Sequence, residues 1–376
     1  MKNRTWIASI FSAVIFTSSA ATRAAPANGD AAGRHAVFVQ TNAPAGNAIV
    51  VYDRNADGTL TFAASYPTGG HGSRAIGAPS DPLASQHSLV YDRSHRLLFA
   101  VNAGSDTVSV FDVDGDQLEL AQVAPSGGPF PVSIAVRDDL AYVLDAGLAG
   151  FVSGFRIDRD HLEAIEGSTR ALGLANTNPP FFLSSPAQIG FSPNGKHLLV
   201  TTKSFNMVDV FEVGRDGQLS APPVRNLEAP VPFPFVFGPA DLLVLVNAGN
   251  SSVATFTIDQ GGTLVPAGAP VSDGQMAACW IVSAHEFEYV ANTGSNDISQ
   301  YRVRGDGTVT LVNATAASGI PGVTDMATAS GGKFLYVLSG TSSTVYAYRV
   351  EGDGSLTFIQ TVPVPGGANM EGIAAN

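Results

Sequence analysis

The chain has 376 residues, a formal net charge of −12 and a single cysteine, Cys279. An acidic surface of this size repels nucleic acid and anionic membranes, so we expect neither as a partner. A lone cysteine excludes an intramolecular disulfide, and stability must therefore come from burial of a core.

The first 25 residues have the layout of a cleaved secretory signal peptide. Lys2 and Arg4 precede an apolar run, Trp6 to Thr17, which is too short to cross a bilayer and is followed by small residues. We predict a signal peptide over residues 1–25 and an exported protein, periplasmic or secreted, with no membrane span. Residues 26–376 are expected to form a single domain, with a net charge of about −15 once the three basic residues of the leader are removed from −12.

A pattern recurs seven times along the rest of the chain. It consists of an apolar run, a small polar turn, an alternating β-branched and aromatic run, an Asp/Gly turn and a further apolar run, as in LFAVNAGSDTVSVFDVDGDQLEL. With a further strand ahead of it, such as HSLVYD, each copy predicts four antiparallel strands. Seven such units predict an all-β, seven-bladed β-propeller. The equivalent aromatic residues, spaced 59, 44, 56, 45, 45 and 47 apart, are Tyr52, Phe111, Phe155, Phe211, Phe256, Tyr301 and Tyr348.

The first copy contains the stretch DRNADGTL, Asp53 to Leu60, which begins like a calcium-binding EF-hand loop. Three of the other copies place Arg156, Arg302 and Arg349 where Asp53 would be the first ligand, and Ala64 stands where such a loop needs a bidentate Glu. We therefore predict a hairpin turn, in which Asp and Gly supply positive φ angles. No metal or cofactor is expected.

The C-terminal GGANMEGIAAN aligns with GGPFPVSIAV, which leads into a predicted inner strand. The N-terminal copy lacks such a strand. We therefore predict that the last blade is closed by both chain termini, which removes exposed sheet edges.

The copies VNAGSDTVSVFDVD and VNAGNSSVATFTID resemble the lactonase family of seven-bladed propellers, which includes 6-phosphogluconolactonase and 3-carboxymuconate cyclase. YVANTGSNDISQY resembles the related YVTN-repeat surface propellers. The resemblance implies His, Arg and Glu side chains around the mouth of the central channel. Of these, His87 is retained, whereas other matching positions hold Ala187, Phe233, Ala248 and Thr293. Most of the implied catalytic set is replaced.

Loops on one face of such a propeller define the expected pocket. We consider His87, Glu371 and Arg74 as catalytic candidates, because neighbouring blades could bring an acid and a base together. Aromatic loops could supply hydrophobic anchors, or their rings could pack beneath their own loops. The candidate ligand-binding residues are Phe130, Phe181, Phe182, Phe233, Lys203, Asp325 and His71, and Asp145 is a further polar candidate.

These residues leave two functions open. One is a monomeric binding module for a small molecule, glycan or protein on the loop-bearing face, and the missing charged residues favour it. The alternative is a lactonase or cyclase with a site around His87. Cys279, within the apolar AACWIV, is expected to be a buried core residue.

Overall fold

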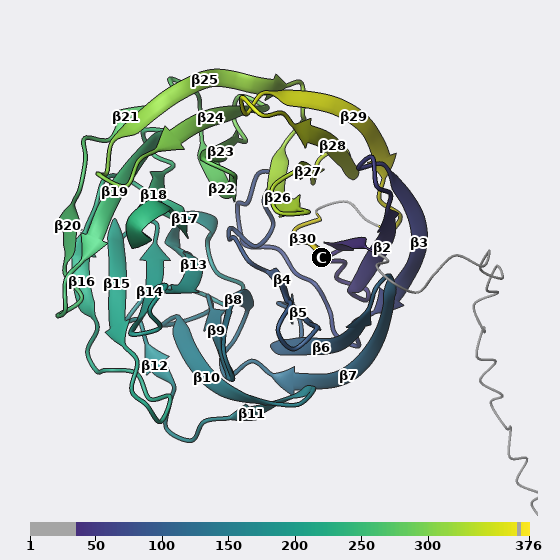
Figure 1. Ribbon diagram of the computed structural model, residues 1–376. Helices are drawn as coiled ribbons and strands as arrows, with labels where there is room; N and C mark the ends of the chain where they lie inside the picture. Colours follow the sequence, from purple (N-terminus) through teal and green to yellow (C-terminus); the bar gives the residue numbers. More distant parts are fainter. Residues whose placement is uncertain (1–34, 367–369) are drawn as a thin grey trace, which may run out of the picture. The chain divides into compact units, whose positions relative to one another are not determined.

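The computed structural model describes residues 35–366 and 370–376; the predicted signal peptide lies outside them. Their strands form seven antiparallel sheets of four or five strands each. Figure 1 shows these sheets as blades around a ring, and each innermost strand contacts the innermost strands of both neighbouring blades. The predicted all-β, seven-bladed propeller is confirmed.

The blades are numbered from the first complete one. The first consists of β4 (Leu89–Asp92), β5 (Leu97–Asn102), β6 (Thr107–Asp114) and β7 (Gln117–Pro125). The second consists of β8 (Pro131–Arg137), β9 (Leu140–Asp145), β10 (Phe151–Asp158), β11 (His161–Ala164) and β12 (Arg170–Ala171). The third consists of β13 (Pro186–Phe191), β14 (His197–Thr202), β15 (Met207–Glu212) and β16 (Val224–Leu227).

The fourth blade consists of β17 (Pro232–Phe237), β18 (Leu243–Asn247), β19 (Ser252–Ile258), β20 (Leu264–Pro266) and β21 (Val271–Ser272). The fifth consists of β22 (Ala278–Ala284), β23 (Phe287–Asn292), β24 (Asp297–Val303) and β25 (Val309–Ser318). The sixth consists of β26 (Val323–Ala329), β27 (Phe334–Ser339), β28 (Thr344–Val350) and β29 (Leu356–Pro363). The helical segments that the structure describes are two short 3-10 turns, η1 (Phe182–Ser184) and η2 (Pro239–Asp241), and neither could span a membrane.

The seventh blade joins the two ends of the described chain, as predicted. It consists of β30 (Ile373–Ala375), β1 (Ala36–Gln40), β2 (Ala48–Arg54) and β3 (Leu60–Pro67). Within it, Val37 pairs with Ala375 and Val39 with Ile373. The Ala36 N–H also donates to Asn376 Oδ1 at 2.7 Å. This pairing leaves no unpaired inner edge on the N-terminal strands.

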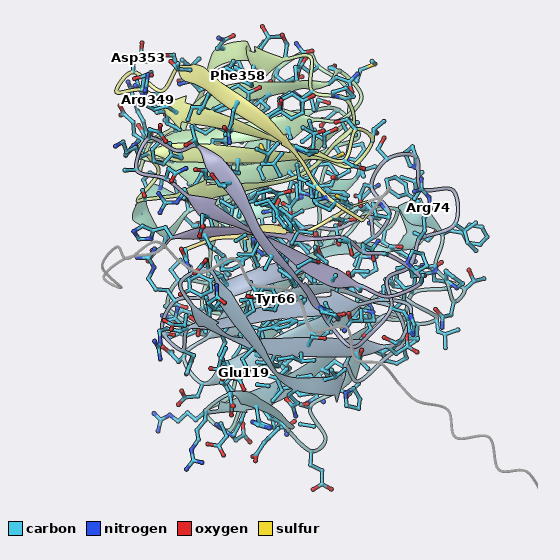
Figure 2. The ribbon with its side chains drawn as sticks, turned by 90° about the vertical axis from the view of Figure 1, so that its right-hand side faces the viewer. Tyr66, Arg74, Glu119, Arg349, Asp353 and Phe358 are labelled. Atoms are coloured by element: carbon cyan, nitrogen blue, oxygen red, sulfur yellow. The ribbon has the colours of Figure 1, made fainter. Side chains whose placement is uncertain are left out.

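Burial explains which residues form which strand. Second strands such as β5 and β27 are buried along their whole length, because a neighbouring blade covers each face of the sheet. Most residues of outer strands such as β3 and β7 are exposed or half-buried, because no further strand covers them. Figure 2 shows Tyr66 and Glu119 on these outer strands, at the periphery of the ring.

The Asp/Gly turns are hairpins that also join neighbouring blades. In the first copy, Gly58 has φ 89° and Asp57 accepts the Thr59 N–H, so the predicted turn is confirmed. Tyr336 of the sixth blade donates its hydroxyl to Gly58 O at 3.0 Å. A Cβ at Gly58 would lie 2.4 Å from the Phe334 ring, so both conformation and packing require glycine there. Two other blades repeat this contact, through Tyr142 to Gly217 O and Tyr289 to Gly354 O.

Two loops interrupt the regular repeat and lie against each other. The first insertion, residues 68–88, precedes β4, and the second insertion, residues 172–185, precedes β13. They pair through Ile76, whose N–H donates to Pro180 O and whose carbonyl accepts the Phe182 N–H at 3.0 Å. Figure 2 shows Arg74 of the first insertion at one face of the ring, and Arg349 of β28 and Asp353 of the turn that follows at the other.

Candidate functional site

The end of the first insertion crosses the central region of the ring (Figure 1). Trp280, on the inner strand of the fifth blade, donates its indole N–H to Ser85 O at 3.0 Å. Gln86 donates to Ile281 O at 3.0 Å and accepts the Ile281 N–H at 3.1 Å. These contacts join residues about half the chain apart. We call Ser85, Gln86 and Trp280 the plug, because they lie between the two ends of the channel.

The first cavity lies on the insertion side of this plug. It has a volume of about 320 Å³ and is mostly apolar. The second insertion supplies Phe182 and Leu183, and the inner strands of the fourth and fifth blades supply Phe233 and Trp280, whose rings pack edge to face at 5.7 Å. The polar groups that line it include Asp81, Lys203, Cys279 and Thr293.

Lys203 is the one basic residue among the described residues that line this cavity, and it is 1% exposed. Its Nζ donates to Ala84 O at 2.6 Å and to Pro186 O at 3.1 Å, and it lies 5.1 Å from the centre of the Phe233 ring. An ammonium has three N–H donors, so these two acceptors leave one N–H for a ligand. Burial lowers the pKa of Lys203 to about 7, although Asp81 and Glu371 act in the opposite direction.

Two buried carboxyl groups lie near Lys203. Asp81 Oδ1 accepts the Ala84 N–H at 2.6 Å, whereas Oδ2 receives no backbone donor from the described residues. Glu371 accepts the Leu83 N–H at 2.7 Å, and its Oε1 lies 3.0 Å from Ser85 Oγ. Glu371 thus ties the C-terminal segment to the first insertion.

The pKa values of both carboxyl groups are raised. Burial and then the Asp81 charge raise the pKa of Glu371 well above its ordinary value. Burial also raises the pKa of Asp81, but a proton shared with Glu371 and the Lys203 ammonium oppose that rise. Of the two, Asp81 lines the cavity and Glu371 does not. The site places a carboxyl group and an amine at the wall of an apolar cavity, which is an acid-base pair that can move a proton.

Asp325 and Cys279 complete the surroundings of this cluster. Asp325 accepts the Met326 and Ile373 N–H groups, and burial raises its pKa to about 8. It is not among the residues that line the cavity. Burial raises the pKa of Cys279 to about 12, so its thiol is not a thiolate nucleophile near neutral pH.

The second cavity lies on the other side of the plug, beside the far halves of the inner strands of the first four blades. Its volume is about 410 Å³. His87 lines it, together with Arg137, Gln188 and three phenylalanines. The structure therefore places His87 and Glu371 in different parts of the channel, with different neighbours.

The other predicted residues are dispersed. Arg74 donates to Ala78 O and Pro79 O, so it supports the loop that carries Asp81. His71 is exposed and lies 3.1 Å from Pro44 O. The structure therefore gives His87, Glu371 and Arg74 separate neighbours rather than one catalytic group.

The four phenylalanines do not form one exposed arc. Phe130 is 1% exposed, belongs to the core and lines neither cavity. Phe233 is equally buried, as the packing alternative expects, but it lines the first cavity together with the half-buried Phe182. Phe181 is 49% exposed at the outer surface of the second insertion.

Sequence reasoning missed Asp81 and Trp280, although two signals in the repeat point to the site. The spacings of 59 and 56 residues mark the two insertions that cover the cavity. The second signal is the residue that follows the second strand of each blade. This residue is Lys203 in the third blade and a small residue in the other complete blades. Its equivalents in the other complete blades are Ala103, Ala146, Ala248, Thr293 and Gly340.

The sequence profile of the family described as "Lactonase, 7-bladed beta-propeller" matches residues 34–277 and 264–371. The chain belongs to this family. The 6-phosphogluconolactonase of Yersinia pseudotuberculosis serotype O:3 (strain YPIII) is 24% identical over 228 residues, which cover 55% of this lactonase-family chain. The match spans 66% of the relative, just under two thirds of its length.

Solved structures share the fold of this lactonase-family chain. The periplasmic gluconolactonase of Pseudomonas aeruginosa superposes with a TM-score of 0.67 at 16% identity, covering 91% of this chain and 99% of that one. A protein from Lactobacillus plantarum superposes with a TM-score of 0.66 at 20% identity, covering 91% and 98%. At these identities the likeness establishes the architecture alone.

Proposed function

We propose that this lactonase-family propeller hydrolyses a small, uncharged and largely apolar lactone in the first cavity. The observation that carries the proposal is the buried Lys203 amine with a free N–H beside the Asp81 carboxylate, at the wall of a 320 Å³ apolar cavity. Family membership and the names of the relatives support a lactone as the substrate class.

The proposed reaction uses both groups. Asp81 takes a proton from a water molecule as the water oxygen forms a bond to the lactone carbonyl carbon. The remaining Lys203 N–H stabilises the negative charge that develops on the carbonyl oxygen. The tetrahedral intermediate then collapses, the ring C–O bond breaks, and the proton held by Asp81 passes to the departing ring oxygen. The product is a hydroxy acid, and both side chains return to their starting charge.

The lining of the cavity favours an uncharged substrate. A phosphorylated lactone needs cationic donors for the phosphate, whereas Lys203 is the one basic residue among the described lining residues. Phe233, Ala248 and Thr293 supply no positive charge, and Asp81 would repel a phosphate. The exposed Ile76, Phe181 and Leu183 of the two insertions favour a lactone with an apolar substituent.

Ligand binding without turnover is the second candidate. Lys203 already donates to two backbone carbonyls, so it could serve as a positioned donor for a bound carbonyl without catalysis. We also propose export to the periplasm or the medium, because residues 1–25 have the composition of a signal peptide. The N-terminus of the mature protein, determined by mass spectrometry, tests the second point.

The decisive experiment measures loss of δ-valerolactone and δ-decalactone above their spontaneous hydrolysis, with 6-phosphogluconolactone for comparison. We expect turnover of the two uncharged lactones and little or none of the phosphorylated one. Asp81→Asn and Lys203→Met should each reduce kcat/KM about 100-fold or more. Asp325→Asn is the matched control, because it replaces a neighbouring buried carboxyl group that does not line the cavity.

Thermal unfolding confirms that each variant is folded. Equal turnover by wild type and Asp81→Asn would exclude the proposed base. Saturable lactone binding by wild type without turnover would instead establish the binding function.

A further inference from the structure

The second cavity is separate from the proposed lactone site. The plug formed by Gln86 and Trp280 lies between them, and the cavity of about 410 Å³ is bounded by residues of β4, β8, β13 and β17 and by the turn after β13. No step of the proposed hydrolysis uses its residues. Its chemistry also differs, because its described lining residues include the cationic Arg137 and no carboxyl side chain.

His87 has a hydrogen-bond donor without an acceptor among its described neighbours. Gln86 and Gln188 each bind one backbone N–H through Oε1 and one carbonyl through Nε2, so the orientation of both amides is fixed. Both Nε2 groups consequently face the imidazole, Gln86 at 3.4 Å from Nε2 and Gln188 at 3.4 Å from Nδ1.

A neutral imidazole has one nitrogen lone pair, so it can accept from one of these amides only. The other ring nitrogen carries a hydrogen that faces a second donor. Protonation would worsen this conflict, and burial lowers the pKa of His87 to about 4, so the ring is neutral at ordinary pH. The unpaired N–H can be satisfied by an acceptor oxygen in the cavity that His87 lines.

The other lining groups define which acceptor fits. Phe191, Phe235 and Phe237 provide aromatic walls, and Phe235 packs edge to face on Phe237 at 6.1 Å. Arg137 supplies the positive charge. Its side chain packs against Gly195, where a Cβ would lie 2.4 Å from Nε, so the turn after β13 restrains the guanidinium. Its nearest carboxylate, Asp138, is mostly exposed and 3.5 Å away.

We propose that the second cavity binds a small aromatic carboxylate. The aromatic ring would lie among the three phenylalanines, and the carboxylate would accept hydrogen bonds from the donors Arg137 and His87. The net negative charge of the chain does not attract an anion from a distance, so recognition must come from these local donors.

Calorimetric titration of the mature protein with benzoate tests this site, with benzamide as the uncharged analogue of the same shape. We expect one benzoate per chain and binding of benzamide about tenfold weaker or more. Arg137→Gln should weaken benzoate binding about tenfold, and His87→Asn should weaken it as well. Asn is chosen because residue 87 has φ 68°, which Asn tolerates. Phe182→Ala, in the first cavity, should leave benzoate binding unchanged.

If the His87→Asn variant does not fold, the Arg137→Gln variant still tests the proposal, because Arg137 is half-exposed and its replacement should not unfold the protein. Absence of saturable benzoate binding to wild type would overturn the proposal. So would binding that Phe182→Ala abolishes and Arg137→Gln retains, because benzoate would then occupy the first cavity. Neither outcome bears on lactone turnover, which is measured separately.

Discussion

The two cavities of the channel are built by different means. The first lies beneath two insertions, and its chemistry depends on an ammonium and a carboxylate, Lys203 and Asp81, that the regular repeat does not supply. The second lies beside the far halves of the inner strands, with glutamines whose amides are fixed by backbone groups. Both depend on the same plug, so the channel combines two environments within one scaffold.

This difference teaches where charge enters a repetitive fold. Regular positions carry small or neutral polar side chains that satisfy the backbone of a neighbouring strand, such as Asn102, which donates to Ser109 Oγ at 2.8 Å. The charged side chains of the first cavity are found where the sequence of one copy of the repeat differs from the other copies. Lys203 and Asp81 are two such charged groups, and each lies near a group of opposite charge. A buried charged group without such a partner should lower the stability of the folded protein.

The largest effect is expected from removal of the segment that both cavities need. Deletion of residues 366–376 removes β30 and Glu371, and leaves β1 with an unpaired edge. The deletion should abolish the cooperative unfolding transition or lower Tm by many degrees, because the ring opens. Circular dichroism during heating measures this.

Glu371→Gln is the matched control for the deletion. It keeps the strand and loses only the carboxyl group, so it should retain a cooperative transition. A truncated protein that melts like the wild type would show that the ring does not need β30.

The fold could be predicted from the sequence because seven copies each specify the same strands and turns. The shared blade was predictable too, since GGANMEGIAA matches the approach to β8. The functional site was harder to predict from the sequence. Asp81 belongs to an insertion with no equivalent in the other copies, so no register indicates where its side chain lies. His87 was identified from a resemblance, and no sequence pattern shows that the plug separates it from Glu371.

The second prediction concerns Asp145, a buried carboxyl group that departs from the repeat without an opposite charge beside it in the described part of the chain. It stands where Asn102 and Asn292 donate to a serine in the equivalent blades, and its carboxyl oxygens make no hydrogen bond of standard geometry with the described residues. Burial raises the pKa of Asp145 to about 7. Asp145→Asn should therefore stabilise the protein, because its amide could donate to Ser153 as Asn102 does to Ser109.

The sign of the pH dependence follows from that raised pKa. Between an ordinary value near 3.8 and about 7, the folded state holds a proton that the unfolded state has released, so wild-type stability falls as pH rises. The gain from Asp145→Asn should be about 2 kcal/mol at pH 8 and close to zero near pH 4. Urea unfolding at both pH values measures it. A gain independent of pH would assign the effect to packing rather than charge.

The third prediction separates the first cavity from the second by pH. Turnover in the first requires the Lys203 proton, and the pKa of Lys203 is about 7. Lactone kcat/KM should therefore fall about tenfold for each pH unit above that value. Benzoate binding in the second cavity, which uses neutral His87 and Arg137, should not follow this curve. A flat kcat/KM profile up to alkaline pH would show that the Lys203 ammonium is not needed.

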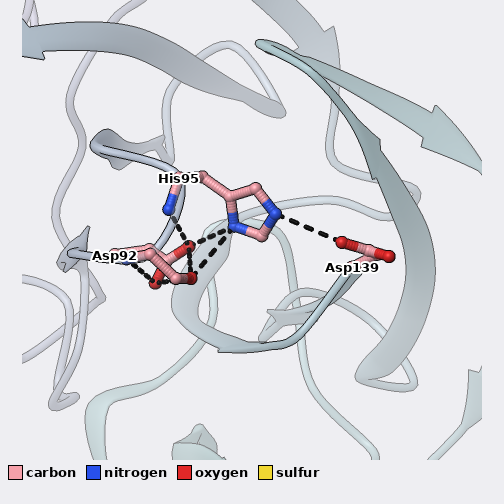
Figure 3. Close-up of polar contacts among 4 residues, drawn as sticks. Asp92, His95 and Asp139 are labelled. Atoms are coloured by element: carbon pink, nitrogen blue, oxygen red, sulfur yellow. Dashed lines mark hydrogen bonds and ion pairs between the residues drawn. The ribbon is translucent and has the colours of Figure 1, made fainter.

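The smallest expected effect is at the turn between β4 and β5, where His95 joins the first and second blades. Figure 3 shows the imidazole between two carboxylates, with Nδ1 2.5 Å from Asp92 and Nε2 3.2 Å from Asp139. Hydrogen bonding to Asp92 raises the pKa of His95, although partial burial opposes it and Asp139 adds to it. A raised folded-state pKa means that protonation stabilises the fold. This contribution is complete below the ordinary value of 6.5 and is lost as pH rises through the folded-state pKa.

His95→Gln should consequently cost about 0.5 kcal/mol at pH 5.5 and nothing measurable at pH 9, since partly exposed ion pairs contribute little. Urea unfolding at the two pH values provides the measurement. His161→Gln is the matched control, because His161 pairs only with its exposed sequence neighbour Asp160 among the described residues. An equal cost at both pH values would mean that His95 acts through packing. A cost of several kcal/mol would mean that this contact holds the first two blades together.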